Sequence, residues 1–232
     1  MSNILCISDT HYPFAHQDHL SFLKAINKKY KFDRVVMLGD EIDYSALSYH
    51  ESDPDLPSAS KELELAQKHI KRLEKIFPNM DLLHSNHGSM VYRKRKTYGF
   101  PKQAIKDYAD ILGVNPKKWK WHDKLIIKDK FGSYYFTHNM NADCLKSAQA
   151  LNYSGYIQSH YHSRYELKFF SSPEALRWGA TIGCLIDKDS LAFAYSRVNI
   201  KRPVLGTLII LDGVPQLIPM VLKRGNRWNK KI

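Results

Sequence analysis

The sequence predicts an α/β protein built around two packed β-sheets. Short apolar runs and amphipathic segments alternate over the first 112 residues, whereas the rest of the chain is rich in predicted strands and holds one predicted helix. The chain has 232 residues, of which 44% are hydrophobic and 25% charged, as is typical of a protein with a packed core. This composition excludes a chain that is disordered throughout.

The first half predicts three strands that alternate with helices. Apolar runs that stop at polar residues predict buried strands over residues 4–8, 34–38 and 81–84. Apolar residues at helical spacing predict helices over residues 17–30, 58–77 and 102–112. The helix over 58–77 has the clearest pattern, and Pro78 blocks its continuation.

After residue 119 the sequence predicts mostly strands. Strands are predicted over residues 119–128, 134–137, 156–159, 165–170, 180–185, 192–196, 205–211 and 216–221. One helix is predicted over residues 142–151. Repeats, low-complexity tracts and linkers are lacking from the sequence, so we expect one domain over residues 1–232, with a basic C-terminal tail at residues 223–232.

The net charge of +12 indicates an anionic partner, such as a nucleotide, a nucleic acid, a phosphorylated substrate or an acidic membrane. The charge is concentrated in two blocks, with +8 over residues 87–130 and +5 over residues 223–232. Residues 1–86, in contrast, carry a net charge of −3.

The three cysteines, Cys6, Cys144 and Cys184, are widely spaced and form no disulfide or CxxC pattern, which favours a reducing compartment. The N-terminus lacks the basic and apolar regions of a signal peptide, and no apolar run approaches the length of a membrane span. We therefore expect a cytoplasmic protein with no membrane partner.

Polar side chains follow the predicted strands at the points where they end. The residues are Asp9, His11, Asp40, Asp43, Asn86, His87, His138, His160 and His162. Because the carboxyl ends of parallel strands meet at one edge of a sheet, we expect these side chains to converge. The set of oxygen and nitrogen donors without thiolate suits divalent cations, and its size suits two ions that share a carboxylate.

At these residues the sequence resembles the calcineurin-like metallophosphoesterases. The family pattern runs Asp-x-His, Gly-Asp-x-x-Asp, Gly-Asn-His-acid, a lone His and Gly-His-x-His. Here the corresponding segments begin at Asp9, Gly39, Ser85, His138 and Ser159, in the same order. The resemblance implies a four-layer αββα sandwich of two mixed sheets flanked by helices, with a dinuclear metal centre at the strand ends.

The resemblance also implies the role of each residue. Asp9, His11, Asp40 and His162 would hold one metal. Asp40 would bridge the two metals. The second site would be completed by Asn86, His138 and His160. His87 would protonate the leaving oxygen, and Asp43 would keep His87 protonated. Two such cations can lower the pKa of a shared water, whose hydroxide then attacks phosphorus in line. Mn²⁺ is our expectation, and Fe, Zn²⁺, Ni²⁺ or Mg²⁺ are alternatives.

The chain departs from the family pattern at a few positions. Gly88 replaces the acid after the histidine, and Ser85 and Ser159 replace glycines. Tyr44 stands where phosphoprotein phosphatases have an arginine, which disfavours that branch. Asp43 stands where purple acid phosphatases have a metal-binding tyrosine, which disfavours that branch as well.

The basic block that begins at His87 predicts the substrate class. Arg93 and Arg95 are candidate phosphate ligands because a guanidinium binds two oxygens at once, and Tyr92 is a candidate for stacking on a base. In size and in this block the chain resembles small phage-encoded members of the family, some of which are thought to act on deoxynucleoside 5′-monophosphates. We expect a nucleotide phosphomonoesterase. The alternatives are a phosphodiesterase or nuclease acting on DNA or RNA, and a nucleic-acid-binding module without activity.

Overall fold

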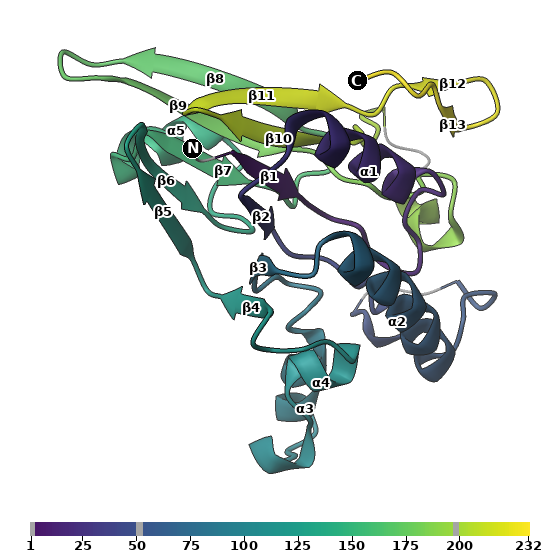
Figure 1. Cartoon of the computed structure of the whole chain (residues 1–232). Helices are drawn as coiled ribbons and strands as arrows, with labels where there is room; N and C mark the ends of the chain where they lie inside the picture. The colour runs from purple at the N-terminus through teal and green to yellow at the C-terminus, as the bar shows by residue number, and fades with distance from the viewer. Residues whose placement is uncertain (1–2, 50–52, 197–199) are drawn as a thin grey trace.

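Two β-sheets pack face to face in the computed structural model, which describes residues 3–49, 53–196 and 200–232 (Figure 1). The first sheet has the strand order β11-β10-β1-β2-β3-β4. Its strands are β1 (Ile4–Ile7), β2 (Arg34–Met37), β3 (Met80–Leu83), β4 (Trp119–His122), β10 (Gly206–Leu211) and β11 (Val214–Pro219). Strands β1 to β4 are mutually parallel, and β10 pairs antiparallel with β1 and β11.

The second sheet has the order β5-β6-β7-β9-β8. Its strands are β5 (Leu125–Asp129), β6 (Gly132–Phe136), β7 (Gly155–Gln158), β8 (Tyr165–Ser171) and β9 (Leu176–Ile182). Strands β6, β7 and β9 are parallel, whereas β5 and β8 are antiparallel to their neighbours at the two edges. Both sheets are therefore mixed.

Helices cover the outer face of each sheet and make four layers. Helices α1 (His19–Tyr30) and α2 (Ala59–Ile76) cover the first sheet, and α5 (Cys144–Leu151) covers the second (Figure 1). The central strands β1 and β7 are buried on both faces. In β1, for example, Leu5 faces the helices and Cys6 faces the second sheet. This confirms the predicted αββα sandwich, and the double burial explains why the strands are continuous apolar runs.

Three predicted elements differ from the structure. Residues 119–128 form two strands, because the turn at Asp123 and Lys124 carries the chain from the first sheet to the second. Residues 102–112 contain a 3-10 turn at Lys102–Ala104 and the short α4 at Tyr108–Leu112 instead of one helix. The segment after His87, for which the apolar spacing predicted no helix, forms α3 (Met90–Thr97).

Two further predicted strands differ from the structure. Residues 192–196, predicted as a strand, lie in a 3-10 segment at Leu191–Ser196. The strand expected over 180–185 begins earlier, as β9, because its pairing with β8 starts at the Leu176–Ser171 pair. A further 3-10 turn lies at Ser45–Leu47.

The basic tail folds back onto α1. Residues Leu222–Lys223 and Arg227–Trp228 form the hairpin of β12 and β13. The Arg227 guanidinium donates to both oxygens of Asp18 at 2.7 and 2.6 Å, and the Trp228 N–H donates to the same carboxylate at 2.9 Å. These donors hold the pKa of Asp18 down, at about 2. Part of the tail's charge therefore anchors the C-terminal hairpin to the body of the molecule.

Cys6, Cys144 and Cys184 are all buried and unpaired. Within the described ranges, the helices are too short or too polar for any of them to span a bilayer.

Candidate metal centre

The strand-end residues lie together at the carboxyl edge of the parallel strands. Asp9 and His11 follow β1, Asp40 follows β2, His138 follows β6 and His160 follows β7. Asp9, His11, Asp40 and His160 have φ between +45° and +69°, a region that costs free energy for residues with a Cβ. Such turns redirect the chain sharply at the end of a strand, so the side chains face one another across the edge.

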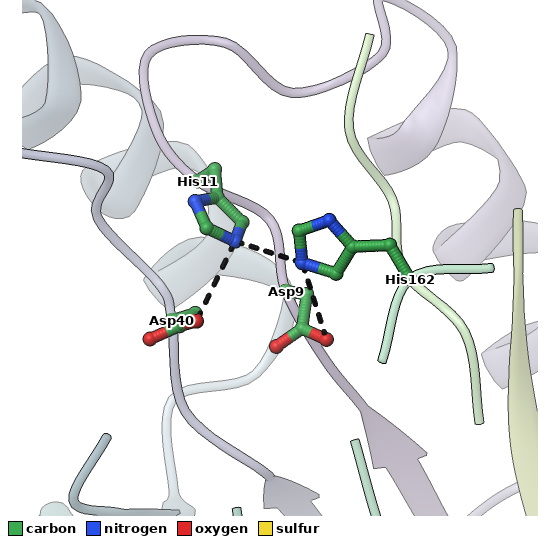
Figure 2. A group of neighbouring side chains, drawn as sticks. All are labelled: Asp9, His11, Asp40 and His162. Atoms are coloured by element: carbon green, nitrogen blue, oxygen red, sulfur yellow. Dashed lines mark hydrogen bonds and ion pairs between the residues drawn. The ribbon is translucent and has the colours of Figure 1, made fainter. Parts of the chain in front are cut away.

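Asp9, His11, Asp40 and His162 form the first cluster, shown in Figure 2. Their candidate ligand atoms all lie within 4.8 Å of one another. His11 Nε2 lies 3.2 Å from His162 Nε2 and 3.6 Å from Asp40 Oδ2. His162 Nε2 lies 3.7 Å from Asp9 Oδ2. Three of the four residues are buried, so protein surrounds the cluster on most sides.

A second cluster contains Asp40, His138 and His160, and therefore shares Asp40 with the first. His138 Nδ1–H donates to the Leu38 carbonyl at 2.8 Å, which leaves Nε2 directed into the cluster. That Nε2 atom lies 3.2 Å from Asp40 Oδ2 and 2.8 Å from Asn86 Oδ1. Asn86 thus joins the residues that the sequence assigned to the second metal.

Asp43 and His87 lie beside the first cluster. Asp43 Oδ1 is 2.6 Å from His11 Nδ1, so it fixes the ring and leaves Nε2 for a ligand. The same oxygen is 3.7 Å from His87 Nδ1, and His87 Nδ1–H donates instead to the Asp43 backbone carbonyl. Burial and the nearby His11 lower the pKa of His87. The Asp43 carboxylate therefore lies near both imidazoles and makes its shorter contact with His11.

The pKa values of the carboxylates and imidazoles in the two clusters are shifted in different directions. Burial raises the pKa of Asp9 to about 7. Burial also acts to raise the pKa of Asp40, but the charge of His138 and a hydrogen bond from it hold that pKa well below its usual range. For His11, burial is outweighed by the hydrogen bond to Asp43 and the charge of Asp40, so its pKa rises to about 9. Without a cation, carboxylates and imidazoles thus share protons here, and cation binding would displace them.

The donor set fits divalent cations. In the first cluster, His11 Nε2 and His162 Nε2 lie close together, and each can offer a lone pair to a cation. Asp9 Oδ1 is buried without a hydrogen-bond partner. A cation among these atoms would satisfy all of them, and carboxylate, amide and imidazole ligands suit Mn²⁺, Fe or Zn²⁺. The residues can therefore hold metal ions.

Of the three expected substrate contacts, only Arg93 lies against a residue of the two clusters. Its guanidinium donates to the Asn86 carbonyl at 2.7 Å. Arg95 donates to the Phe100 carbonyl at 2.7 Å, and the Tyr92 hydroxyl donates to the Lys106 carbonyl at 3.3 Å. Arg95 and Tyr92 are thus engaged with the segment that follows α3.

The structure adds residues that the sequence patterns did not reveal. Ser85 Oγ accepts from the backbone N–H groups of Asp40 and Gly88, at 2.9 and 3.2 Å, and so ties together the segments that carry Asp40 and His87. Phe193 packs its ring 5.5 Å from that of His11. Ser85 lay within the motif and could have been suspected, whereas Phe193 lies far along the chain in a segment predicted as a strand.

Gly88, which replaces an acidic residue of the family pattern, leaves room for a tyrosine. A Cβ at this position would lie 3.0 Å from the Tyr108 hydroxyl and 3.2 Å from Ser85 Oγ. In this region the buried Glu41 accepts through Oε1 from Trp121 Nε1 at 3.2 Å. Tyr108 also packs edge to face on Trp121, so α4 is fixed to the sheet directly behind the metal centre.

Solved structures with a similar fold were found at low sequence identity. Vps29 from Chaetomium thermophilum is 11% identical, with a TM-score of 0.52 over 99% of this chain and 94% of that chain. A hypothetical protein from Pyrococcus horikoshii OT3 is 8% identical, with a TM-score of 0.54 over 97% and 90%. An archaeal phosphodiesterase is 14% identical, with a TM-score of 0.48 over 94% and 99%. At these identities the first two show a shared fold. No curated protein matches the sequence.

Membership of a family rests on the sequence itself. The family described as calcineurin-like phosphoesterase matches residues 2–183, which include every residue of the two clusters. The chain therefore belongs to the calcineurin-like phosphoesterases, which are metal-dependent hydrolases of phosphoric esters.

Proposed function

We propose that the chain uses two divalent metal ions, preferably Mn²⁺, to hydrolyse phosphomonoesters of nucleotides. The observation that carries this proposal is the pair of ligand clusters that share Asp40, one with Asp9, His11 and His162 and one with His138 and His160. When bound, the cations would neutralise charge on the phosphoryl oxygens and lower the pKa of the attacking water.

In this proposal His87 protonates the leaving group. Its Nδ1–H is held by the Asp43 carbonyl, so Nε2 is free to face the ester oxygen that departs. Its backbone N–H donates to Asp40 Oδ1 at 3.1 Å, which ties the position of the ring to the shared ligand. Asp43 acts on both histidines, through its carboxylate on His11 and its carbonyl on His87.

A monoester is favoured because a cationic side chain, that of Arg93, lies at the edge of the site. A phosphate monoester carries up to two negative charges at neutral pH, whereas a diester carries one. Arg93 is fixed against the carbonyl of Asn86, next to the ligand side chain of the same residue. Its remaining N–H groups can bind a terminal phosphoryl oxygen, which a diester replaces with a second ester group.

A phosphodiesterase or nuclease is the second candidate. The observation that favours it is the run of Lys and Arg residues on and after α3, which continues the positive charge away from the metal centre. A long basic surface suits a polymer with one phosphate at every nucleotide.

A substrate panel separates the two candidates. Purified protein loaded with Mn²⁺ is tested on an aryl phosphate, nucleoside 5′-monophosphates, cyclic nucleotides, single-stranded DNA and duplex DNA. We expect hydrolysis of the aryl phosphate that stops on chelation, and faster phosphate release from mononucleotides than cleavage inside DNA. Internal cleavage of DNA with inert mononucleotides would favour the nuclease, and inactivity with every divalent metal would refute both.

Replacing His87 with alanine should lower kcat by about 10²- to 10⁴-fold while the metal content is kept, because His87 would donate a proton and bind no cation. The loss should grow with the pKa of the leaving group, since a poor leaving group depends more on protonation. Steady-state kinetics on a series of aryl phosphates and elemental analysis of the metal provide the readouts. His84→Ala, an exposed histidine nearby, is the matched control. A lower metal content in His87→Ala would make His87 a ligand instead.

Arg93→Ala should raise KM for a nucleoside monophosphate about tenfold, because a charged hydrogen bond to the phosphoryl group is lost. Arg95→Ala is the matched control, since that guanidinium is bound to the Phe100 carbonyl. Equal effects of the two substitutions would show that Arg93 acts only through general surface charge.

A further inference from the structure

A basic arm extends from the metal centre. We use this name for residues 89–106, which include α3 and the 3-10 turn at Lys102–Ala104. The arm contains six basic residues and no acidic residue. Figure 1 shows α3 and α4 projecting from the body of the molecule beyond β4. Such a surface is complementary to a polyanion.

Two large aromatic side chains are exposed at the outer end of the arm. Tyr98 is 70% exposed and Phe100 is 55% exposed. The turn that carries them is held in place, because Arg95 accepts from the Phe100 N–H through its carbonyl and donates to the Phe100 carbonyl through its guanidinium. Exposed rings on a fixed backbone among cationic side chains are the arrangement on which unpaired bases stack.

The base of the arm meets the metal centre. Helix α3 begins three residues after His87, and Arg93 donates to the carbonyl of Asn86. On the same side, Lys94 Nζ lies 3.9 Å from the centre of the exposed Tyr49 ring. An eight-residue helix is about 12 Å long, so Tyr98 and Phe100 lie well beyond the groups next to a phosphate at the metals. They are placed to contact nucleotides further along a strand.

We propose that the basic arm binds single-stranded nucleic acid and presents its terminal phosphate monoester to the metal centre. The inference rests on the proposed phosphomonoesterase activity and names the substrate for which the arm is built. Lys96 and Lys102, both exposed, would contact backbone phosphates, while Tyr98 and Phe100 stack on bases. Unpaired bases are required because a duplex buries the base faces.

The reaction needs only water as co-substrate. The water oxygen forms a bond to phosphorus, and the bond between phosphorus and the terminal ester oxygen breaks. That oxygen takes up a proton, so the products are inorganic phosphate and a strand that ends in a hydroxyl. Hydrolysis of this bond leaves the length of the strand unchanged, which distinguishes it from a nuclease reaction.

Binding is tested apart from hydrolysis with a fluorescent single strand that has no terminal phosphate. Anisotropy titrations of the full chain should give tighter binding to this strand than to a duplex of the same length. Phe100→Ala should weaken the binding about tenfold, and Tyr98→Ala similarly. Phe169→Ala, at a ring on β8 that is 49% exposed, is the control and should have no effect. Lys96→Ala should reduce the slope of log affinity against log salt by about 0.7 relative to the exposed Lys24→Ala control.

Hydrolysis gives the second readout. The kcat/KM for a strand with a terminal phosphate, divided by that for an aryl phosphate, should fall about tenfold in Phe100→Ala and stay constant in Phe169→Ala. Equal affinity for strand and duplex, or a ratio that Phe100→Ala does not change, would overturn the inference. Inactivity of the unaltered protein on both substrates would instead refute the proposed function, whatever the anisotropy shows.

Discussion

Replacing Asp40 with asparagine is expected to lower phosphomonoester hydrolysis by at least about 10³-fold, the largest effect among single substitutions in this protein. Asp40 is the residue that the two ligand clusters share. Its Oδ2 lies 3.6 Å from His11 Nε2 and 3.2 Å from His138 Nε2, and its Oδ1 accepts the His87 N–H. Asparagine keeps the shape and one acceptor oxygen but removes the charge that would hold two cations together.

Metal content and activity are measured together in this experiment. Elemental analysis of Asp40→Asn should show a loss of metal, and circular dichroism should show that the fold is kept. Asp123→Asn, in the exposed turn between β4 and β5, provides a carboxylate control that should behave like the unaltered protein. Full activity in Asp40→Asn would refute the assignment of Asp40 as the shared ligand.

Replacing Gly39 with alanine is expected to lower the free energy of unfolding by about 3 kcal/mol and to weaken metal binding as well. Gly39 has φ of +100°, which a residue with a Cβ adopts only at a cost. An added Cβ would lie 2.6 Å from Ser85 Cβ and 3.0 Å from His138 Nδ1. The methyl group would thus push apart the segments that carry Asp40, Asn86 and His138.

A second glycine separates the backbone cost from the steric cost. Gly225 has φ of +80°, but a Cβ there would have no heavy atom within 4 Å. Gly225→Ala should therefore cost only about 1 kcal/mol and leave metal affinity unchanged. Urea denaturation and metal titration of both variants provide the comparison. Equal losses would show that the close approach of Ser85 and His138 to Gly39 is unimportant.

The ligand clusters were predictable because strand ends are encoded locally. Each apolar run stops at the residue where a carboxylate, an amide or an imidazole follows, as at Asp9 after β1 and Asp40 after β2. In parallel strands those ends share one edge of the sheet. The pattern of residue types therefore predicts the position of the site before the packing of the sheets is known.

The partners of the side chains were less predictable. Asp43 was expected to act on His87, yet its carboxylate lies closer to His11 Nδ1, at 2.6 Å, than to His87 Nδ1, at 3.7 Å. Which of two nearby imidazoles a carboxylate meets depends on ring orientation, and this is set by contacts such as that of His87 with the Asp43 carbonyl. The same limit applies to Arg95 and Tyr92, whose neighbours in the folded chain are Phe100 and Lys106.

The sequence by itself determined the α/β class and the family and predicted the donor set, because burial periodicity and strand-end motifs are local properties. Only the tertiary structure decided that residues 119–128 divide between two sheets, that the segment after His87 is a helical arm, and that Asp18 anchors the basic tail. The pairing of β4 with β3 and the contact of Asp18 with Arg227 join residues that are distant in sequence, so no local pattern encodes them.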